Sequence, residues 1–355
     1  AMNAMSRGPS PHFSVERISR STGANAVERA AYRHATRMEA EATGPTKNFG
    51  TQAGALKHSE IMLPGDAPAW AVQAYGEQAF QAALDVILAE PLHQLESPER
   101  PAWARLAERL WNDIERVEWD QNRQPGRAQL AWEITAALPR VLSDGGRIRL
   151  LRDYAAEAFR DHRTAVDCVI RDKGDGNPYA FLALPTRTLG AEGWGGKHRL
   201  PGYQSWLKAL RGTWELHVNL ALEREGRRER IDMRSLADQG RKLESESHDR
   251  RIARNVEKAG GTAVNKLRSE AISQLNKALL REDPRHILPD VQARLSCFTM
   301  PELLAALADR LGVTPDTLPA DLAATVTGSP DLVPTGKTAP DGEPLYFTRA
   351  RSRQE

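Results

Sequence analysis

Tyr32 is the residue of this chain whose neighbours best suit phosphate chemistry. Arg29, Arg33 and Arg37 bracket it at helical spacing. Three guanidinium groups could therefore hold a phosphate against the phenol oxygen, which would act as the nucleophile. Such a reaction normally needs a metal ion that polarises the phosphate as well. The alternative is that Tyr32 is simply a packing residue, the usual role of a tyrosine on an alanine-rich helix.

The metal-binding side chains of the sequence do not supply that ion in an obvious way. The nine histidines are scattered, and no two stand at the spacing of a metal-binding pair. Cys168 and Cys297 lie far apart in apolar surroundings, so neither a disulfide framework nor a thiolate zinc site is expected. Both cysteines are predicted to be core residues.

Residues 171–187 are a second informative stretch, because they join a glycine-rich turn to an apolar strand. Alternation predicts neighbouring strands at 164–170 and 179–184. Val169 and Arg171 should share one face with Tyr179, Phe181 and Ala183. The other face should carry Val166, Cys168, Ile170, Leu182 and Leu184.

The elements around these residues predict an α+β fold, in which helices pack against a sheet. Further strands are expected at 13–19, 56–63 and 129–138. Helices are expected at 25–38, 69–89, 102–119, 147–159, 202–224 and 264–280. Helical segments at 290–296, 300–311 and 319–327 precede two short strands at 331–336 and 343–348. Three helices followed by a two-stranded wing predict a winged-helix-like unit.

The composition is that of a protein without a membrane span. Of the 355 residues, 27% are charged, and no apolar run is long enough to cross a bilayer. No secretory signal is recognisable, so a cytoplasmic location is expected. The net charge of +2 hides a basic middle, residues 201–282, which could follow a phosphate backbone or could be a solvated helical face.

Several ordered motifs resemble the MobA/MobL (MobQ-type) relaxases, especially the N-terminal region of Ti-plasmid TraA relaxase–helicases. They lie at 13–33, 58–70, 110–116, 133–139, 174–178 and 230–240. Residues 295–303 and 329–333 are similar to the segment that joins relaxase to helicase in TraA proteins. The resemblance implies an HUH-type antiparallel sheet that nicks one strand at a plasmid transfer origin, with a tyrosine nucleophile and a Mg²⁺ or Mn²⁺ ion held by three histidines.

The resemblance places Tyr32 at the nucleophile position and Glu133 at an acidic position near the site. The family's His-x-His pair follows Asn-Pro, where this chain has Tyr179 and Phe181, and Arg171 stands at the third histidine. Tyrosine and phenylalanine do not replace neutral imidazoles as ligands, and arginine has no lone pair to offer a cation. No metal or other cofactor is therefore predicted. Arg171 could instead grip a phosphate, with Tyr179 and Phe181 as stacking rings, or the two rings could pack inward.

These residues favour a degenerate relaxase homologue that binds transfer-origin or single-stranded DNA through Arg29, Arg33, Arg171 and Arg187. One alternative is an active strand transferase, in which Tyr32 attacks a phosphate held by arginines or by a metal on Glu133, Asp172 and Asp175. Another is a non-catalytic interaction module of a conjugation or secretion system. Relaxosome or type IV secretion components are possible partners, and no membrane partner is expected.

Four regions are expected along the chain. Residues 1–11 comprise an expression scar and a disordered start, and 12–240 form a relaxase-like domain with an inserted helical segment at about 73–101. A helical connector at 241–283 leads to the winged-helix-like domain at 284–355. Because the sequence stops directly after the wing, a fragment of a longer protein is expected, and a helicase domain could follow.

Overall fold

The computed structural model describes residues 12–89, 99–121, 124–198, 200, 202–244 and 264–350. Contacts divide the chain into an N-terminal unit that reaches Glu225 and a C-terminal unit that begins at Gly226. Residues 1–11, the 90–98 part of the expected insertion and the 245–263 part of the expected connector lie outside the described residues. The four expected region boundaries stay predictions.

A five-stranded antiparallel sheet forms the centre of the N-terminal unit, with strand order β1-β5-β7-β6-β4. Its strands are β1 (Phe13–Ser19), β4 (Leu56–Met62), β5 (Gln129–Ala137), β6 (Val166–Arg171) and β7 (Tyr179–Pro185). All five were predicted from the sequence, with ends that differ by at most two residues. The α+β expectation is confirmed.

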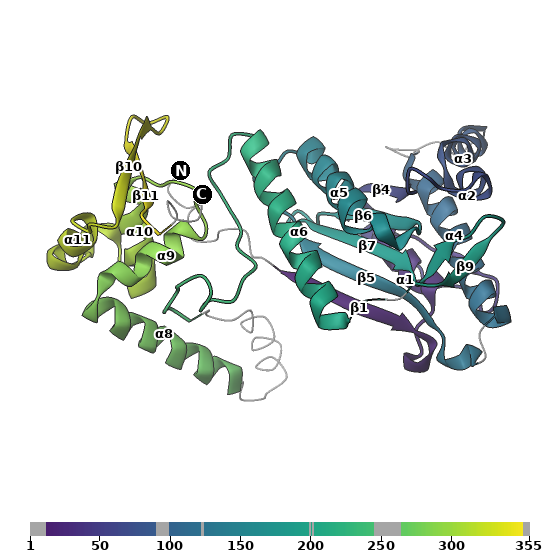
Figure 1. The fold of residues 1–355 in the computed structure, drawn as a ribbon, viewed down its shortest axis with the longest axis horizontal. Helices are drawn as coiled ribbons and strands as arrows, with labels where there is room; N and C mark the ends of the chain where they lie inside the picture. Colours follow the sequence, from purple (N-terminus) through teal and green to yellow (C-terminus); the bar gives the residue numbers. More distant parts are fainter. Residues whose placement is uncertain are drawn as a thin grey trace. The chain divides into compact units, whose positions relative to one another are not determined.

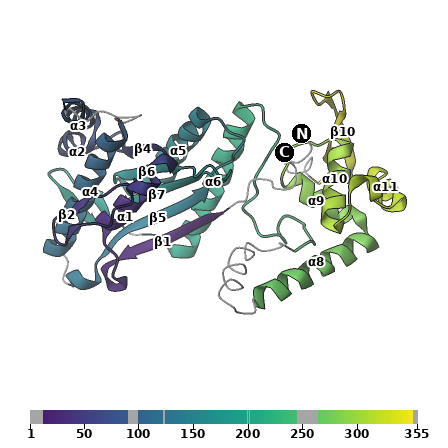
Figure 2. The same ribbon diagram turned by 180° about the vertical axis from the view of Figure 1, so that it is seen from behind.

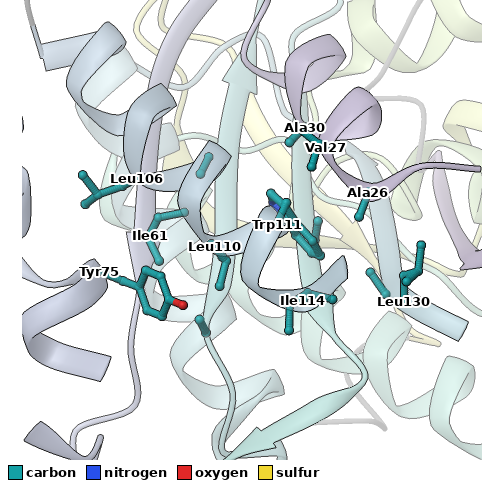
Figure 3. Close-up of a cluster of buried hydrophobic side chains, with 14 of the residues drawn as sticks. Ala26, Val27, Ala30, Ile61, Tyr75, Leu106, Leu110, Trp111, Ile114 and Leu130 are labelled. Carbon is teal, nitrogen blue, oxygen red and sulfur yellow. The ribbon is translucent and has the colours of Figure 1, made fainter. Parts of the chain in front are cut away.

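Helices cover both faces of this sheet (Figures 1 and 2). One face carries α1 (Ala26–Arg33) and α4 (Glu99–Gln121), and the other carries α5 (Asp144–Ala158) and α6 (Tyr203–Arg224). Figure 3 shows the apolar core on the first face, where α1, α4 and the strands meet around the fully buried Trp111. On the second face Trp206 and Trp214 of α6 are buried.

Two helices of the N-terminal unit differ most from the expectation, for local reasons. Asn25 caps α1 by accepting from the backbone N–H groups of Val27 and Glu28, but the helix ends at Arg33 because Ala35 adopts a positive φ of 50°. The expected helix 69–89 is divided at Gly76 into α2 (Ala69–Tyr75) and α3 (Glu77–Ala89). A Cβ atom at Gly76 would lie only 2.5 Å from the carbonyl oxygen of Val72, so this break requires glycine.

Two short hairpins were not predicted. They are β2 (Glu39–Ala40) with β3 (Gly44–Pro45), and β8 (Arg187–Leu189) with β9 (Trp194–Lys197). Short 3-10 turns occur at Arg20–Thr22, Gly50–Ala55, Pro125–Arg127, Arg160–His162, Pro284–His286 and Pro315–Thr317.

The C-terminal unit has the expected winged-helix-like order, but the first helix, expected at 290–296, lies at Ile287–Gln292. It contains α8 (Val264–Glu282), α9 (Ile287–Gln292), α10 (Met300–Leu311), α11 (Ala320–Thr327), and the hairpin β10 (Leu332–Thr338) with β11 (Pro344–Thr348). Phe298, Leu303 and Leu307 are fully buried at its core. The predicted burial of the cysteines is confirmed for Cys168, whereas Cys297 is half-buried. Among the described helices, none is long and apolar enough to span a membrane.

Candidate functional site

The three positions at which the resemblance places histidines lie on one face of the sheet. In the antiparallel register, Arg171 of β6 is opposite Tyr179 of β7, and Val169 is opposite Phe181. Because side chains alternate along a strand, Arg171, Tyr179 and Phe181 share a face. Helix α1, which carries Tyr32, covers the same face.

Tyr32 lies against this face in a half-buried aromatic cluster. Its ring meets Phe49 edge-on at a centroid distance of 5.5 Å and Phe181 at 6.4 Å. The ring of Tyr179, two residues from Phe181 on β7, instead meets the ring of His12 at a centroid distance of 6.2 Å. The structure therefore brings the tyrosine of α1 next to Phe181.

Arg171 is also part of this cluster, because its guanidinium group packs against the Tyr32 ring. Its guanidinium carbon lies 5.0 Å from the ring centroid, which is a cation–π contact. Nη1 donates to the Tyr32 carbonyl oxygen at 3.0 Å, and Nη2 donates to Oε1 of Gln52. Arg171 is only 3% exposed, so these contacts fix its position.

The residues of this cluster do not fit a divalent metal ion. Arg171 brings a positive charge and no lone pair, Phe181 has no donor atom, and the phenol of Tyr179 is a poor ligand for Mg²⁺ or Mn²⁺. In the described parts of the chain, no three His, Cys, Asp or Glu side chains come together in a way that could hold a metal.

Glu133 belongs to a buried ion-pair network on the same sheet face. Both of its carboxylate oxygens accept from guanidinium groups, one from Arg29 and the other from Arg33 Nη1 at 2.5 Å. Arg29 also reaches Glu16 at 2.9 Å. Each carboxylate oxygen of Glu133 therefore already accepts a hydrogen bond from an arginine within this network.

Asp167, which the sequence analysis missed, is the centre of that network. It accepts from Arg33 at 2.8 Å and from Trp111 Nε1 at 2.9 Å, and it contacts His34 Nε2 at 2.8 Å. Burial by itself would raise the pKa of Asp167, but the charges of His34 and Arg33 outweigh burial and hold this pKa well below its usual range. An aspartate inside the apolar run 165–170 was the signal that could have revealed it.

Three of the expected DNA contacts are buried in this structure. Arg33 is fully buried, and burial alone would lower its pKa, but the carboxylates of Asp167 and Glu133 raise it. Arg187 is 6% exposed and donates to Glu118 at 2.6 Å. Arg171 is closed in by Tyr32 and Gln52. In this structure, none of the three presents a free surface to a phosphate, whereas the side chain of Arg29 is 36% exposed.

Comparisons with known proteins point to a single family. Residues 24–259 match the sequence model of the MobA/MobL family. The conjugal transfer protein TraA of Agrobacterium fabrum is 30% identical over 274 residues, which cover 70% of this chain and 22% of that protein. The probable conjugal transfer protein TraA of Sinorhizobium fredii is 29% identical over 259 residues, 67% of this chain and 21% of that protein.

A solved structure described as the molecular basis of vancomycin resistance transfer in Staphylococcus aureus is also similar. It matches with a TM-score of 0.48 and 22% identity, over 63% of this chain and 98% of that one. The present chain spans only about a fifth of the length of the TraA proteins above. Because the family model matches most of its length, the chain belongs to the MobA/MobL family, the relaxase family that its motifs indicate.

Proposed function

We propose that this chain is a degenerate conjugative relaxase homologue, which binds transfer-origin or single-stranded DNA beside Tyr32 and has lost efficient metal-dependent nicking. The observation that carries the proposal is the contact between Arg171 and Tyr32. At a position where the family holds a metal ligand, this chain has a buried cation that already bonds the backbone of the candidate nucleophile. A guanidinium supplies charge there, but it does not coordinate a metal.

The half-buried rings around Tyr32 support single-stranded DNA as the ligand. Tyr32, Phe49 and Phe181 form an aromatic cluster on which exposed bases could stack. Arg29, at the border of the same face, is the expected arginine that keeps enough exposure to contact a phosphate. Affinity should therefore combine stacking with a salt-dependent phosphate term.

Nicking is expected to be absent under conditions in which DNA is bound. Single-stranded oligonucleotides from the native transfer region are titrated with the full chain and with Mn²⁺ or Mg²⁺. Anisotropy reports binding, and a denaturing gel reports a covalent protein–DNA adduct. We expect binding that weakens steeply with salt and no adduct at any metal concentration. Site-specific nicking that disappears in Tyr32→Phe would overturn the proposal.

Removing one aromatic ring should weaken binding without disturbing the fold. Phe181→Leu keeps an apolar side chain of similar size but lacks the ring face, so we expect the affinity for single-stranded DNA to fall about tenfold. The matched control is Phe80→Leu, because Phe80 stacks on Trp103 in the α3–α4 region. Equal affinity of both variants and the parent chain, with unchanged thermal unfolding, would show that no base stacks on this cluster.

An active enzyme is the second candidate function. The altered metal set Glu133, Asp172 and Asp175 is not favoured by the geometry. Glu133 is bound by two arginines, Asp172 lies 3.6 Å from Arg147, and Asp175 accepts from the backbone of Asn177. A metal-independent attack by Tyr32 beside Arg171 is the form of this candidate that remains, and an adduct in the gel would support it.

A third candidate is a non-catalytic module recognised by relaxosome or type IV secretion components in the cytoplasm. Loss of all affinity for single- and double-stranded DNA at low salt would favour it. We also propose, from the resemblance to TraA relaxase–helicases, that a helicase region follows residue 355 in the whole protein.

A further inference from the structure

Three arginines of the C-terminal unit converge on one buried carboxylate. Asp290 of α9 is only 2% exposed. Arg241 donates to its Oδ1 from Nε at 2.6 Å, while Arg310 and Arg294 donate to its Oδ2 from Nη2 at 2.7 Å and 3.3 Å. Because Arg294 and Arg310 share one oxygen, their guanidinium groups lie close together.

The charges of this cluster do not cancel. One carboxylate faces three guanidinium groups, and the exposed Asp309 offsets only part of the excess. Burial, followed by the like charges of Arg310 and Arg241, lowers the pKa of Arg294. A concentration of positive charge at a half-buried place attracts an anion.

Arg294 has donor groups left for such an anion. Its side chain is 36% exposed, and within the described residues its hydrogen bond is the long one to Asp290. The Nε and Nη1 groups are therefore available to a ligand. A planar guanidinium fork matches the oxygens of a phosphate in a bidentate way.

The chain segment beside Arg294 is held in place and is also basic. The backbone N–H of Arg230 donates to the carbonyl oxygen of Arg294 at 2.6 Å, and Ser296 donates to the carbonyl oxygen of Arg228 at 2.7 Å. Arg228 is neutralised by Glu302, whereas the side chain of Arg230 donates to the carbonyl oxygens of Arg227 and Glu229. The arginine cluster thus sits on a fixed backbone.

We propose that Arg241, Arg294 and Arg310 form a phosphate-binding site that takes the sugar–phosphate backbone of a nucleic acid. This site belongs to the C-terminal unit and is separate from the sheet face that carries Tyr32. It gives the winged-helix-like unit a nucleic-acid contact of its own. The competing explanation is that the cluster only fixes Asp290 in the fold.

The test is a salt titration of labelled single- and double-stranded oligonucleotides with the full chain. Arg294→Ala should weaken binding about tenfold, because one charge-assisted contact is lost. It should also make the dependence of log affinity on log salt shallower by about one. Arg294→Lys keeps the charge but loses the fork, so an intermediate loss is expected. Arg285→Ala is the matched control, since Arg285 is an exposed arginine of the same unit that pairs with Asp283.

A titration with inorganic phosphate distinguishes a site for the phosphates of a nucleic acid from a site for free phosphate. Phosphate should compete with DNA and should raise the unfolding temperature of the parent chain more than that of Arg294→Ala. If phosphate binds at Arg294 but DNA affinity is unchanged in Arg294→Ala, the site takes free phosphate and the nucleic-acid assignment is wrong. If neither ligand responds to Arg294→Ala or to Arg294→Lys while both variants fold normally, the cluster is structural only. The proposed function at Tyr32 is tested separately, by adduct formation and by the DNA affinity of Phe181→Leu.

Discussion

Replacing Asp167 with asparagine is expected to lower the free energy of unfolding of the N-terminal unit by about 3–5 kcal/mol. The side chain is fully buried and faces Arg33 and His34, which are buried as well. Without the carboxylate, a guanidinium would remain in the core with only Glu133 to balance it. For a unit of this size, the unfolding temperature should fall by roughly 10 °C, which calorimetry or circular dichroism can measure.

The control is an ion pair of similar chemistry on the surface. Arg116 and Glu41 are 3.0 Å apart, and both side chains are more than half exposed. Arg116→Ala should cost no more than about 1 kcal/mol, because solvent screens an exposed pair. If Asp167→Asn proves as mild as Arg116→Ala, the buried network does not contribute to stability as described.

Acid should remove the contribution of Asp167 to the free energy of unfolding. Its pKa is lower in the folded chain than in the unfolded chain, so its contribution is complete above the unfolded pKa of about 4 and is lost as the pH falls through the folded pKa. The stability difference between the parent chain and Asp167→Asn should therefore shrink once the pH drops below about 4. A stability difference between the two chains that stays constant down to strongly acidic pH would contradict the lowered pKa of Asp167.

The sheet was predictable because its signal is local. Alternation alone placed Arg171 and Phe181 on one face of adjacent strands, and the register confirms it. The C-terminal end of α1 was harder to predict, because Ala35 has a positive φ although neither a glycine nor a proline marks this position in the sequence. The split at Gly76 had a local signal that the helical periodicity on both sides masked.

Helical spacing could not predict which of the arginines would be buried and which exposed. Arg29 and Arg33 both bracket Tyr32, yet one is partly exposed and the other is fully buried. The difference comes from Asp167, which lies more than a hundred residues away in the sequence and meets Arg33 only when β6 joins the sheet. Helical spacing showed which residues share the neighbourhood of Tyr32, but it could not show that Arg33 points to a partner in the core.

Introducing histidines at positions 171, 179 and 181 is expected to create a metal site on this sheet face. In the variant Arg171→His, Tyr179→His, Phe181→His, three imidazoles would lie on one face of β6 and β7, two of them at directly opposed positions. Neutral imidazole is a good ligand for divalent transition metals, whereas the parent side chains are not. Mn²⁺, Ni²⁺ or Zn²⁺ at about a hundredfold above its dissociation constant should stabilise the variant by ~2.7 kcal/mol, and it should leave the parent chain unchanged.

The matched control carries alanine at the same three positions, since it removes the parent side chains without adding ligands. If the side chains at these three positions prevent nicking, the histidine variant should form a covalent adduct with transfer-origin DNA in the presence of metal. The adduct should be absent from the alanine control and from the histidine variant that also carries Tyr32→Phe. A histidine variant that folds and binds metal but makes no adduct would show that three imidazoles alone do not suffice for nicking and would direct attention to other residues, for example the carboxylate network around Glu133. Adduct formation by the parent chain itself would instead favour the active-enzyme candidate, in which the cation beside Tyr32 supplies positive charge without a metal.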